Sequence, residues 1–169
     1  LMTYYNPIFH MGEEKFFLEA KRNGVDGVIV HDLPLEEAGP LMRLAKKHRI
    51  VVVFFLSPTT TVDRIKTIVR ASGGFVYYVS LTGVTGTRKA LPPDLISKIR
   101  LAKRFSSKPI CVGFGVSTPA QVKLISRYAD GVIVGSAIVN VIQKNSHKRD
   151  LVKRVSNFIS QLTASLEKP

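Results

Sequence analysis

Short apolar, β-branched runs alternate with amphipathic segments along the chain, and this alternation limits the possible folds more than any other feature. The predicted strands are residues 1–5, 27–31, 51–56, 75–79, 109–113 and 131–134. The predicted helices are residues 13–23, 36–48, 61–71, 93–105, 118–128 and, at the end, 148–166. Strands that are apolar throughout, each followed by a helix, form a parallel sheet that helices cover. The sequence therefore predicts an α/β fold with six βα units.

An internal repeat gives the length of one unit. The pentapeptide DGVIV occurs at residues 26–30 and again at 130–134. The two copies are 104 residues and four predicted strands apart, so one βα unit takes about 26 residues. A closed (β/α)8 TIM barrel typically needs about 250 residues and at least about 200. The 169 residues therefore predict a single domain, residues 1–169, that is an incomplete barrel lacking two of the eight units.

A doubly wound open sheet is the alternative, because that fold tolerates six parallel strands. Its dinucleotide-binding members carry the pattern G-x-G-x-x-G after the first strand. The first predicted turn here reads YNPIFHMGEE (residues 5–14) and lacks that pattern, which favours the barrel.

No segment predicts a membrane span or a secretory signal. The longest clean apolar run, residues 50–56, is far shorter than the roughly 18 residues that suggest a transmembrane helix. The N-terminal residues show no basic segment followed by a long apolar one. Cys111 is the one cysteine and can form no intrachain disulfide, which fits a reducing, cytoplasmic location.

The formal charge of +13 raises the question of a nucleic-acid partner. Many basic residues fall on the polar faces of predicted helices: Lys46, Lys47, Lys98, Arg100, Lys103, Arg104, Lys148, Arg149, Lys153 and Arg154. They are not interleaved with aromatic residues, and no nucleic-acid-binding motif accompanies them. Solvated helix faces that steer anions are the favoured interpretation, with neither nucleic acid nor membrane as a partner.

Glycine-rich turns after the last two predicted strands indicate phosphate binding. Gly113 and Gly115 follow one strand, and Gly135 follows the next, where Ser136 opens a short apolar helix. Glycines let backbone N–H groups approach an anion, and the amides at a helix N-terminus favour negative charge. Ordinary turn chemistry with a serine cap is the alternative for either loop alone. Barrel enzymes often bind phosphate after strands seven and eight, so the missing pair of strands is predicted to be N-terminal.

Five motifs together carry a family resemblance. They are YYNPIF (4–9), GVDGVIVHDLP (24–34), FVYYVSLTGVTG (75–86), GFGVSTPAQV (113–122) and DGVIVGSAIV (130–139). In this order, over nearly the whole chain, they resemble the tryptophan synthase α subunit from its third barrel strand to its C-terminus. The resemblance implies a lyase of tryptophan biosynthesis, which cleaves indole-3-glycerol phosphate by a retro-aldol reaction to indole and glyceraldehyde 3-phosphate.

The resemblance also implies site residues. In the family the loop after strand six is a mobile lid. The glycines and hydroxyl residues at 80–87 fit such a lid. Thr85 would orient catalytic groups as the lid closes. The expected phosphate ligands are Gly86, Gly115, Gly135 and Ser136. The expected lining of the indole and glycerol pocket is Tyr4, Phe55, Tyr77, Phe114 and Ile133. Core packing is the alternative role for Tyr77 and Phe114.

The catalytic residues are the largest departure from the family pattern. The family's essential Glu and Asp come from the second strand and the following loop, and those segments would precede Leu1. This chain alone is therefore expected to be inactive. Asp32 is the first candidate for a substitute acid–base group, and His31 is the second. The remaining histidines, His10, His48 and His147, are predicted to lie on the surface. No cluster has metal-ligand spacing, so no metal is expected.

The family's partner is a pyridoxal-phosphate β subunit, with which the α subunit forms a heterotetramer. This subunit itself is expected to hold no cofactor. Asn6 and Pro7 in one turn and Pro34 in another would contact the β subunit. Two alternatives stay open: a catalytically inactive barrel remnant that binds phosphate ligands or the β subunit only, and a phosphate-binding barrel that is not a lyase.

Overall fold

The computed structural model describes residues 1–79, 94–113, 115–164 and 166. The strands are β1 (Met2–Thr3), β2 (Gly27–Val30), β3 (Val51–Val53), β4 (Phe55–Leu56), β5 (Val76–Val79), β6 (Ile110–Gly113) and β7 (Gly131–Ile133). The helices are α1 (Tyr5–Met11), α2 (Glu13–Arg22), α3 (Gly39–Lys47), α4 (Val62–Ala71), α5 (Leu95–Phe105), α6 (Pro119–Ser126), α7 (Ser136–Asn145) and α8 (Leu151–Thr163).

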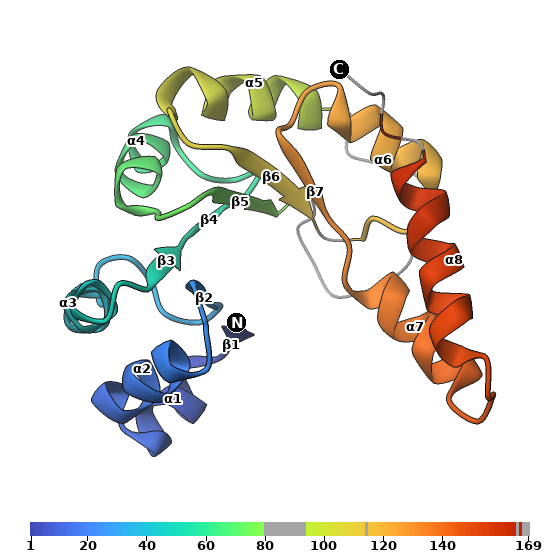
Figure 1. The fold of residues 1–169 in the computed structure, drawn as a ribbon. Helices are drawn as coiled ribbons and strands as arrows, with labels where there is room; N and C mark the ends of the chain where they lie inside the picture. The colour runs from blue at the N-terminus through green and yellow to red at the C-terminus, as the bar shows by residue number, and fades with distance from the viewer. Residues whose placement is uncertain (80–93, 114, 165, 167–169) are drawn as a thin grey trace.

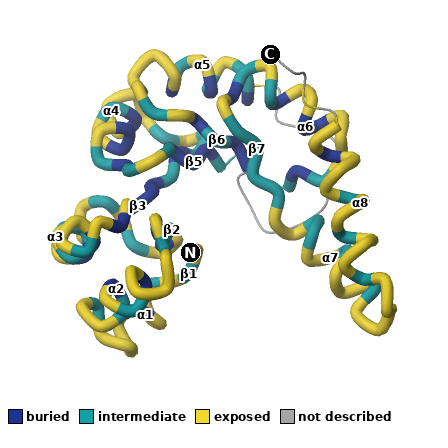
Figure 2. Tube along the Cα trace, viewed as in Figure 1, coloured by how far each residue is buried: buried dark blue, intermediate teal, exposed yellow. Residues whose placement is uncertain are grey.

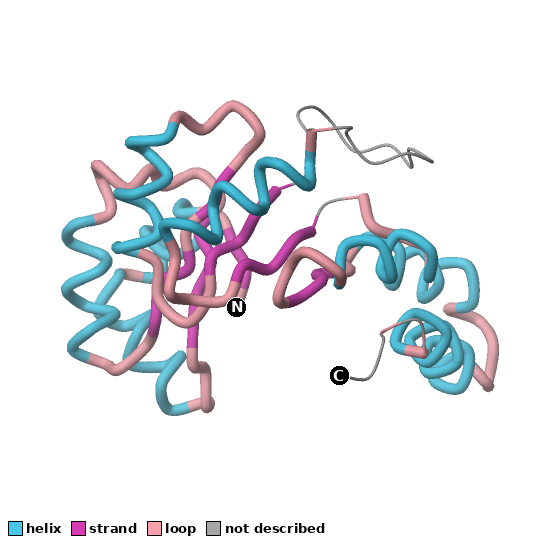
Figure 3. The backbone as a smooth tube through the Cα atoms, turned by 90° about the horizontal axis from the view of Figure 1, so that it is seen from above, coloured by secondary structure: helices cyan, strands magenta, loops and turns pink. Residues whose placement is uncertain are grey.

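All paired strands are parallel and neighbours follow chain order, β1-β2-β3 in one sheet and β4-β5-β6-β7 in the other. The ribbon curves like an open arc, with the strands on the inside and α2 to α6 on the outside (Figure 1). A view turned by 90° shows the strands side by side within the helices (Figure 3). A doubly wound sheet would reverse its strand order and carry helices on both faces. The strand order therefore confirms the predicted α/β barrel-type arrangement, and among the described residues β1 and β7 each pair on one side only.

The strands hold many of the buried residues, whereas most exposed residues lie in the helices and loops (Figure 2). The side chains that face the helices are almost fully buried and form the core, among them Val28, Leu56, Val76, Ile110 and Val112. The side chains that face the inside of the arc alternate with these, as the period of two along a strand requires. Several of them are apolar and exposed, such as Met2, Tyr4 and Val51. The inner face of the arc is thus apolar, and its side chains on β1 and β3 are partly exposed to solvent.

The predicted strand 51–56 is interrupted at Phe54, which divides the sheet in two. The backbone N–H of Phe54 donates to the Ser72 hydroxyl at 3.0 Å, and the same hydroxyl donates to the carbonyl of Phe75 at 2.6 Å. The carbonyl of Phe54 accepts from Tyr77 N, which continues the connection to β5. A buried serine therefore supplies the hydrogen bond that the backbone lacks at the break.

Replacing Ser72 with alanine is expected to lower the free energy of unfolding by about 1–3 kcal/mol, because the buried Phe54 N–H is left without a partner. The measurement is urea denaturation at equilibrium. Ser156→Ala on the exposed side of α8 serves as the control and should change stability little. Equal stability of Ser72→Ala and the wild type would show that Phe54 finds another partner.

The segment that follows β1 was predicted to be an extended strand and a turn, and this prediction is wrong. Residues from Tyr5 onward form helix α1. Pro7 is its third residue. Proline is tolerated in the first turn because backbone nitrogens there make no intrahelical hydrogen bond. Ile8 is fully buried and anchors the helix, while Phe9 is 68% exposed.

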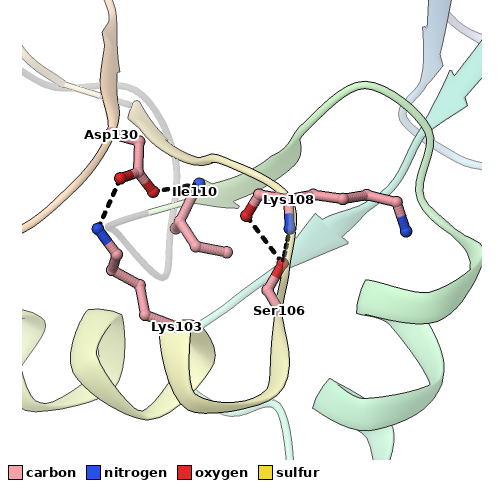
Figure 4. Close-up of polar contacts among 5 residues, drawn as sticks. All are labelled: Lys103, Ser106, Lys108, Ile110 and Asp130. Atoms are coloured by element: carbon pink, nitrogen blue, oxygen red, sulfur yellow. Dashed lines mark hydrogen bonds and ion pairs between the residues drawn. The ribbon is translucent and has the colours of Figure 1, made fainter.

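The repeated DGVIV pentapeptides both form strands, but their aspartates differ. Asp130 accepts from Ile110 N at 2.9 Å and from Lys103 Nζ at 2.6 Å, so it connects β7, β6 and α5 (Figure 4). Burial by itself raises the pKa of the Asp130 carboxyl, but the Ile110 N–H and the Lys103 ammonium outweigh this, and the pKa lies below its ordinary value. In the same region the Ser106 hydroxyl bonds both backbone groups of Lys108.

Asp130 makes stability depend on pH. A lowered folded-state pKa contributes stability above the ordinary aspartate pKa, and the contribution disappears as the pH falls through the folded-state value. Asp130→Asn is therefore expected to be roughly 1 kcal/mol less stable than wild type at pH 7, with the difference vanishing in strong acid. The matched control is Asp26→Asn, because Asp26 begins the other copy of the repeat and is exposed. A difference that persists at low pH would contradict the assignment.

No helix among the described residues is both long and apolar enough to cross a membrane.

Candidate functional site

The candidate site lies at the carboxyl ends of the strands, where the loops of successive units meet. The residues that follow β1, β2 and β4 belong to the described part of the chain, as do Gly115 after β6 and Gly135 after β7. The predicted lid and its residues Thr85 and Gly86 lie outside the described residues, and so does Phe114.

A row of four rings crosses the inner face at this edge. The ring centroids of Tyr4 and His31 are 5.5 Å apart, those of His31 and Phe55 are 5.3 Å apart, and those of Phe55 and Tyr77 are 5.2 Å apart. The interplanar angles are 30°, 29° and 37°. The Tyr4–His31 and His31–Phe55 pairs are stacked, and the Phe55–Tyr77 pair is tilted. We call these four side chains the aromatic row.

The strand register explains the row. Thr3 lies opposite Val30, so the residues that follow them, Tyr4 and His31, stand side by side. Phe55 is paired directly with Tyr77 on the neighbouring strand. The structure thus brings together three predicted pocket residues, Tyr4, Phe55 and Tyr77, and adds His31 between the first two. Tyr4 is 63% exposed, so the row begins at an open surface.

The row ends against β6 and β7. A Cβ atom added at Gly113 would lie 2.5 Å from Tyr77 Oη and 2.9 Å from Ile133 Cβ. Gly113 therefore leaves the space that the Tyr77 ring occupies, and Ile133, another predicted pocket residue, lies on the far side of the same space. Burial raises the pKa of the Tyr77 phenol above its ordinary value.

A cleft of about 410 Å³ opens beside the row. Its lining includes His31, Asp32, Pro34, Phe55, Leu56, Ser57, Thr60, Arg64 and Val79. Arg64 holds Glu36 by two hydrogen bonds of 2.7 and 3.0 Å, and Ser57 N donates to Thr60 Oγ1 at 2.9 Å. The cleft thus combines one aromatic wall with hydroxyl groups, which is typical of sites for small organic ligands.

Asp32 connects two of the loops. Its Oδ1 accepts from Tyr5 N at 2.7 Å, the first N–H of α1. A carboxylate at a helix N-terminus stabilises the helix, so Asp32 fixes α1 against the turn after β2. The residues predicted to contact a partner, Asn6, Pro7 and Pro34, are exposed on these two connected segments. Asp32 stays a prediction as an acid–base group, with one carboxylate oxygen engaged by the backbone.

The predicted phosphate loops have distinct backbone geometry. Gly115 has φ +77°, a conformation that side chains with a Cβ rarely adopt. Gly135 is the N-cap of α7, and a Cβ added there would meet no protein atom within 4 Å. Ser136 is the first residue of α7, as predicted. The open space before α7 and its first amides suit an anion.

Gln121, which was not predicted to have a role, holds the loop between β6 and α6. Its side-chain oxygen accepts from Ser117 N at 2.9 Å and from Thr118 N at 3.2 Å, while Thr118 Oγ1 accepts from Gln121 N. This is a capping box, and the sequence T-P-A-Q carries its signature. The amides of Ser117 and Thr118 are thereby engaged within the loop.

The other histidines and the cysteine have structural surroundings. His10 and His147 are exposed, as predicted. The prediction for His48 is wrong: its side chain is only 13% exposed and its Nε2 lies 2.9 Å from Glu14, which also binds Lys47. Burial and nearby Asp130 raise the pKa of the Cys111 thiol. No group of three metal-binding side chains occurs in the part of the chain that the structure describes.

Comparison with known proteins gives consistent matches. The family model described as "Tryptophan synthase alpha chain" matches residues 1–167. The tryptophan synthase alpha chain of Methanocaldococcus jannaschii is 45% identical over 157 residues, which are 93% of this chain and 56% of the relative. That of Geotalea daltonii is 43% identical over 166 residues, 98% of this chain and 62% of the relative. This chain therefore spans about six-tenths of the length of these relatives.

A solved structure agrees with the sequence relatives. The chain is similar, with a TM-score of 0.86 and 40% identity, to a structure described as that of the tryptophan synthase a2b2 complex from Pyrococcus furiosus. The match covers 97% of this chain and 66% of the other.

Proposed function

This chain belongs to the family of tryptophan synthase alpha chains, and we propose that it forms the indole- and phosphate-binding part of a lyase. The proposed reaction is the retro-aldol cleavage of indole-3-glycerol phosphate to indole and glyceraldehyde 3-phosphate in tryptophan biosynthesis. The observation that carries this proposal is the aromatic row, which lies at the same edge of the strands as the turns at Gly115 and Gly135.

The two parts of the site match the two ends of the substrate. The row and Ile133 offer flat apolar surface for an indole ring, and the cleft beside them holds the hydroxyls of Ser57 and Thr60. Gly115, Gly135 and Ser136 offer backbone amides and a helix N-terminus for the phosphate. Gly86, Thr85 and Phe114, which the family resemblance adds, complete the proposed set.

The acid–base chemistry is proposed to come from elsewhere in the protein. The cleavage needs proton transfer at the indole ring and at the glycerol hydroxyl, together with stabilisation of positive charge on the indole nitrogen. In the family this work belongs to a Glu and an Asp from the second strand and its loop. We propose that this chain is inactive without those residues. A barrel remnant that only binds ligands is the alternative.

The experiment uses a fusion of this chain to the part of the Methanocaldococcus jannaschii relative that precedes the matched stretch, which we call the barrel fusion. Calorimetric titration is expected to detect both glycerol 3-phosphate and indole, each binding without displacing the other, and indole-3-glycerol phosphate is expected to displace both. Competition between the two small ligands would contradict separate subsites. Binding of glycerol 3-phosphate without any binding of indole would support a phosphate-binding barrel that is not a lyase.

The proposed partner is a β subunit that carries pyridoxal phosphate, in a heterotetramer of two α and two β subunits. The proposed contact is the exposed surface formed by α1 and the turn after β2, with Asn6, Pro7 and Pro34. Phe9, which is 68% exposed on α1, extends this surface. Large exposed apolar side chains that cluster on one surface are typical of protein interfaces.

Asp32→Ala is expected to weaken binding of the barrel fusion to a β subunit about tenfold, because α1 loses a charge-assisted hydrogen bond of roughly 1.5 kcal/mol. Asp32→Asn keeps an acceptor oxygen and should restore most of the affinity, as measured by surface plasmon resonance. The exposed Asp63, replaced by alanine, is the control. If Asp32→Asn binds normally but loses indole formation, Asp32 is an acid–base group rather than a support for α1.

A further inference from the structure

We propose that the side chains of Tyr5 and Glu13 form a clasp that fixes helix α1 in the orientation that the partner subunit recognises. This inference rests on the proposed function and deepens it, since it names two positioning residues for the surface at which the β subunit is proposed to bind. Both side chains of the clasp are half-buried, whereas the contact proposed above consists of exposed residues.

Helix α1 depends on contacts from outside for its position. It has seven residues, and isolated helices shorter than about 12 residues are marginal in water. Its N-cap residue makes no side-chain capping hydrogen bond, and Ile8 is its one buried residue. The exposed residues that would meet a partner, Asn6, Pro7 and Phe9, are therefore only as well placed as the groups that hold α1.

The junction between α1 and α2 does not by itself fix the angle between the two helices. A single residue, Gly12, ends α1 and precedes α2, and its φ of +88° is a conformation that favours glycine. Glycine has the widest choice of backbone conformations, so the junction is the least constrained point of this segment. Helix α2 is firmly anchored, because Phe17 is fully buried. A second connection from α1 to α2 therefore sets the orientation of α1.

The Tyr5 hydroxyl makes this connection. It donates to Glu13 Oε1 at 2.8 Å, which joins the first residue of α1 to the first residue of α2. This hydrogen bond, together with burial, raises the pKa of the Tyr5 phenol. The backbone N–H of the same residue donates to Asp32 at 2.7 Å. Tyr5 thus binds the turn after β2 through its backbone and α2 through its side chain.

An α1 that is fixed in advance favours association with a partner. If α1 opens, the partner meets the competent surface only part of the time, and the apparent affinity falls by that fraction. Loss of the clasp should therefore slow association, while dissociation stays unchanged because the bound partner itself holds α1. Loss of a direct contact such as Phe9 should instead speed dissociation, as most interface mutations do.

The experiment compares Tyr5→Phe, Glu13→Ala and their combination in the barrel fusion. Tyr5→Phe keeps the ring and the backbone N–H and removes only the hydroxyl. Hydrogen exchange of the α1 amides measures how often the helix opens, and surface plasmon resonance gives the association and dissociation rates for a β subunit. Phe9→Ala is the comparison for a direct contact. Tyr128→Phe, which removes a hydroxyl from the segment after α6, is the matched control.

Tyr5→Phe is expected to speed exchange of the α1 amides about fivefold, the size of one hydrogen bond, and to slow association about threefold at an unchanged dissociation rate. The double variant should be little worse than either single variant, because both remove the same bond. Unchanged exchange in Tyr5→Phe would overturn the inference. Faster exchange with an unchanged association rate would also overturn it, since the clasp would then serve stability alone.

Failure of the proposed partner gives a different result. A wild-type fusion that forms indole but binds no β subunit would contradict the proposed partner, and this inference with it, even where exchange of the α1 amides responds to Tyr5→Phe. A wild-type fusion that binds the β subunit, with Tyr5→Phe and Tyr128→Phe both associating at the wild-type rate, would contradict the clasp alone.

Discussion

Replacing Gly135 with aspartate is expected to weaken the binding of glycerol 3-phosphate at least about a hundredfold without loss of fold stability. Two unit charges about 4 Å apart repel each other by roughly 4 kcal/mol near a protein surface, which exceeds the energy of a hundredfold change. The variant places a carboxylate in the open space before α7, where the phosphate is proposed to lie.

The structure predicts that the fold tolerates this change. Apart from its chain neighbours, no described atom lies within 4 Å of a Cβ at Gly135, and its φ of −119° is outside the left-handed region that favours glycine. A loss of phosphate binding with an unchanged thermal transition therefore reports on the site rather than on folding.

The matched control is Asn140→Asp, which adds the same charge on an exposed position of α7, beyond its first turn. This variant should weaken phosphate binding no more than about twofold, because screening reduces the effect of a distant exposed charge. Equal affinities for glycerol 3-phosphate in Gly135→Asp and the wild type would show that the phosphate binds elsewhere.

Replacing Gly113 with alanine is expected to damage both stability and ring binding. The added methyl group would lie 2.5 Å from Tyr77 Oη, 2.7 Å from Tyr77 Cε2 and 2.9 Å from Ile133 Cβ, so the Tyr77 ring must move. Overpacking of this kind typically costs about 1–3 kcal/mol. Because Tyr77 ends the aromatic row, we expect the affinity for indole in the barrel fusion to fall at least about tenfold, a loss of roughly 1.4 kcal/mol.

A second-site variant distinguishes displacement of Tyr77 from a general loss of stability. Tyr77→Leu combined with Gly113→Ala removes the two shortest contacts but leaves the one to Ile133 Cβ, so it should regain part of the stability but not the indole affinity. Gly135→Ala is the matched control, since its methyl group enters open space. Urea denaturation and indole titration of the four proteins give both quantities. Normal indole binding by Gly113→Ala would contradict the assigned role of Tyr77.

Much of the fold could be predicted from the sequence because it depends on local patterns. Runs such as Val76–Val79 are apolar on both faces, and a parallel sheet covered by helices buries both faces of such strands. The repeat at Asp26 and Asp130 gave the unit length, from which the barrel arrangement followed. The predictions failed where a distant residue decides the local structure.

Helix α1 is the clearest example of such a failure. Its sequence, YNPIFHM, carries a proline and few strong helix formers, so local propensity favours a turn. The helix forms because Asp32, 27 residues away, accepts the first N–H and because Ile8 is fully buried. The interruption at Phe54 likewise depends on Ser72, which lies at the end of α4.

The site was predictable in its parts but not in its assembly. The family motifs pointed to Tyr4, Phe55 and Tyr77 as pocket residues, whereas the stacking of these rings through His31 follows from strand register. A lone histidine after a strand gives no signal of this kind. Gln121 could have been found, because the capping box is written in the four residues Thr118 to Gln121.

The measurement that tests the central claim most directly is indole formation from indole-3-glycerol phosphate by the barrel fusion. We expect indole and glyceraldehyde 3-phosphate in equal amounts from the fusion, none from this chain alone, and none from the fusion that carries Gly135→Asp. A fusion that folds and binds both glycerol 3-phosphate and indole but forms no indole would contradict the claim that this chain is the substrate-binding part of a lyase.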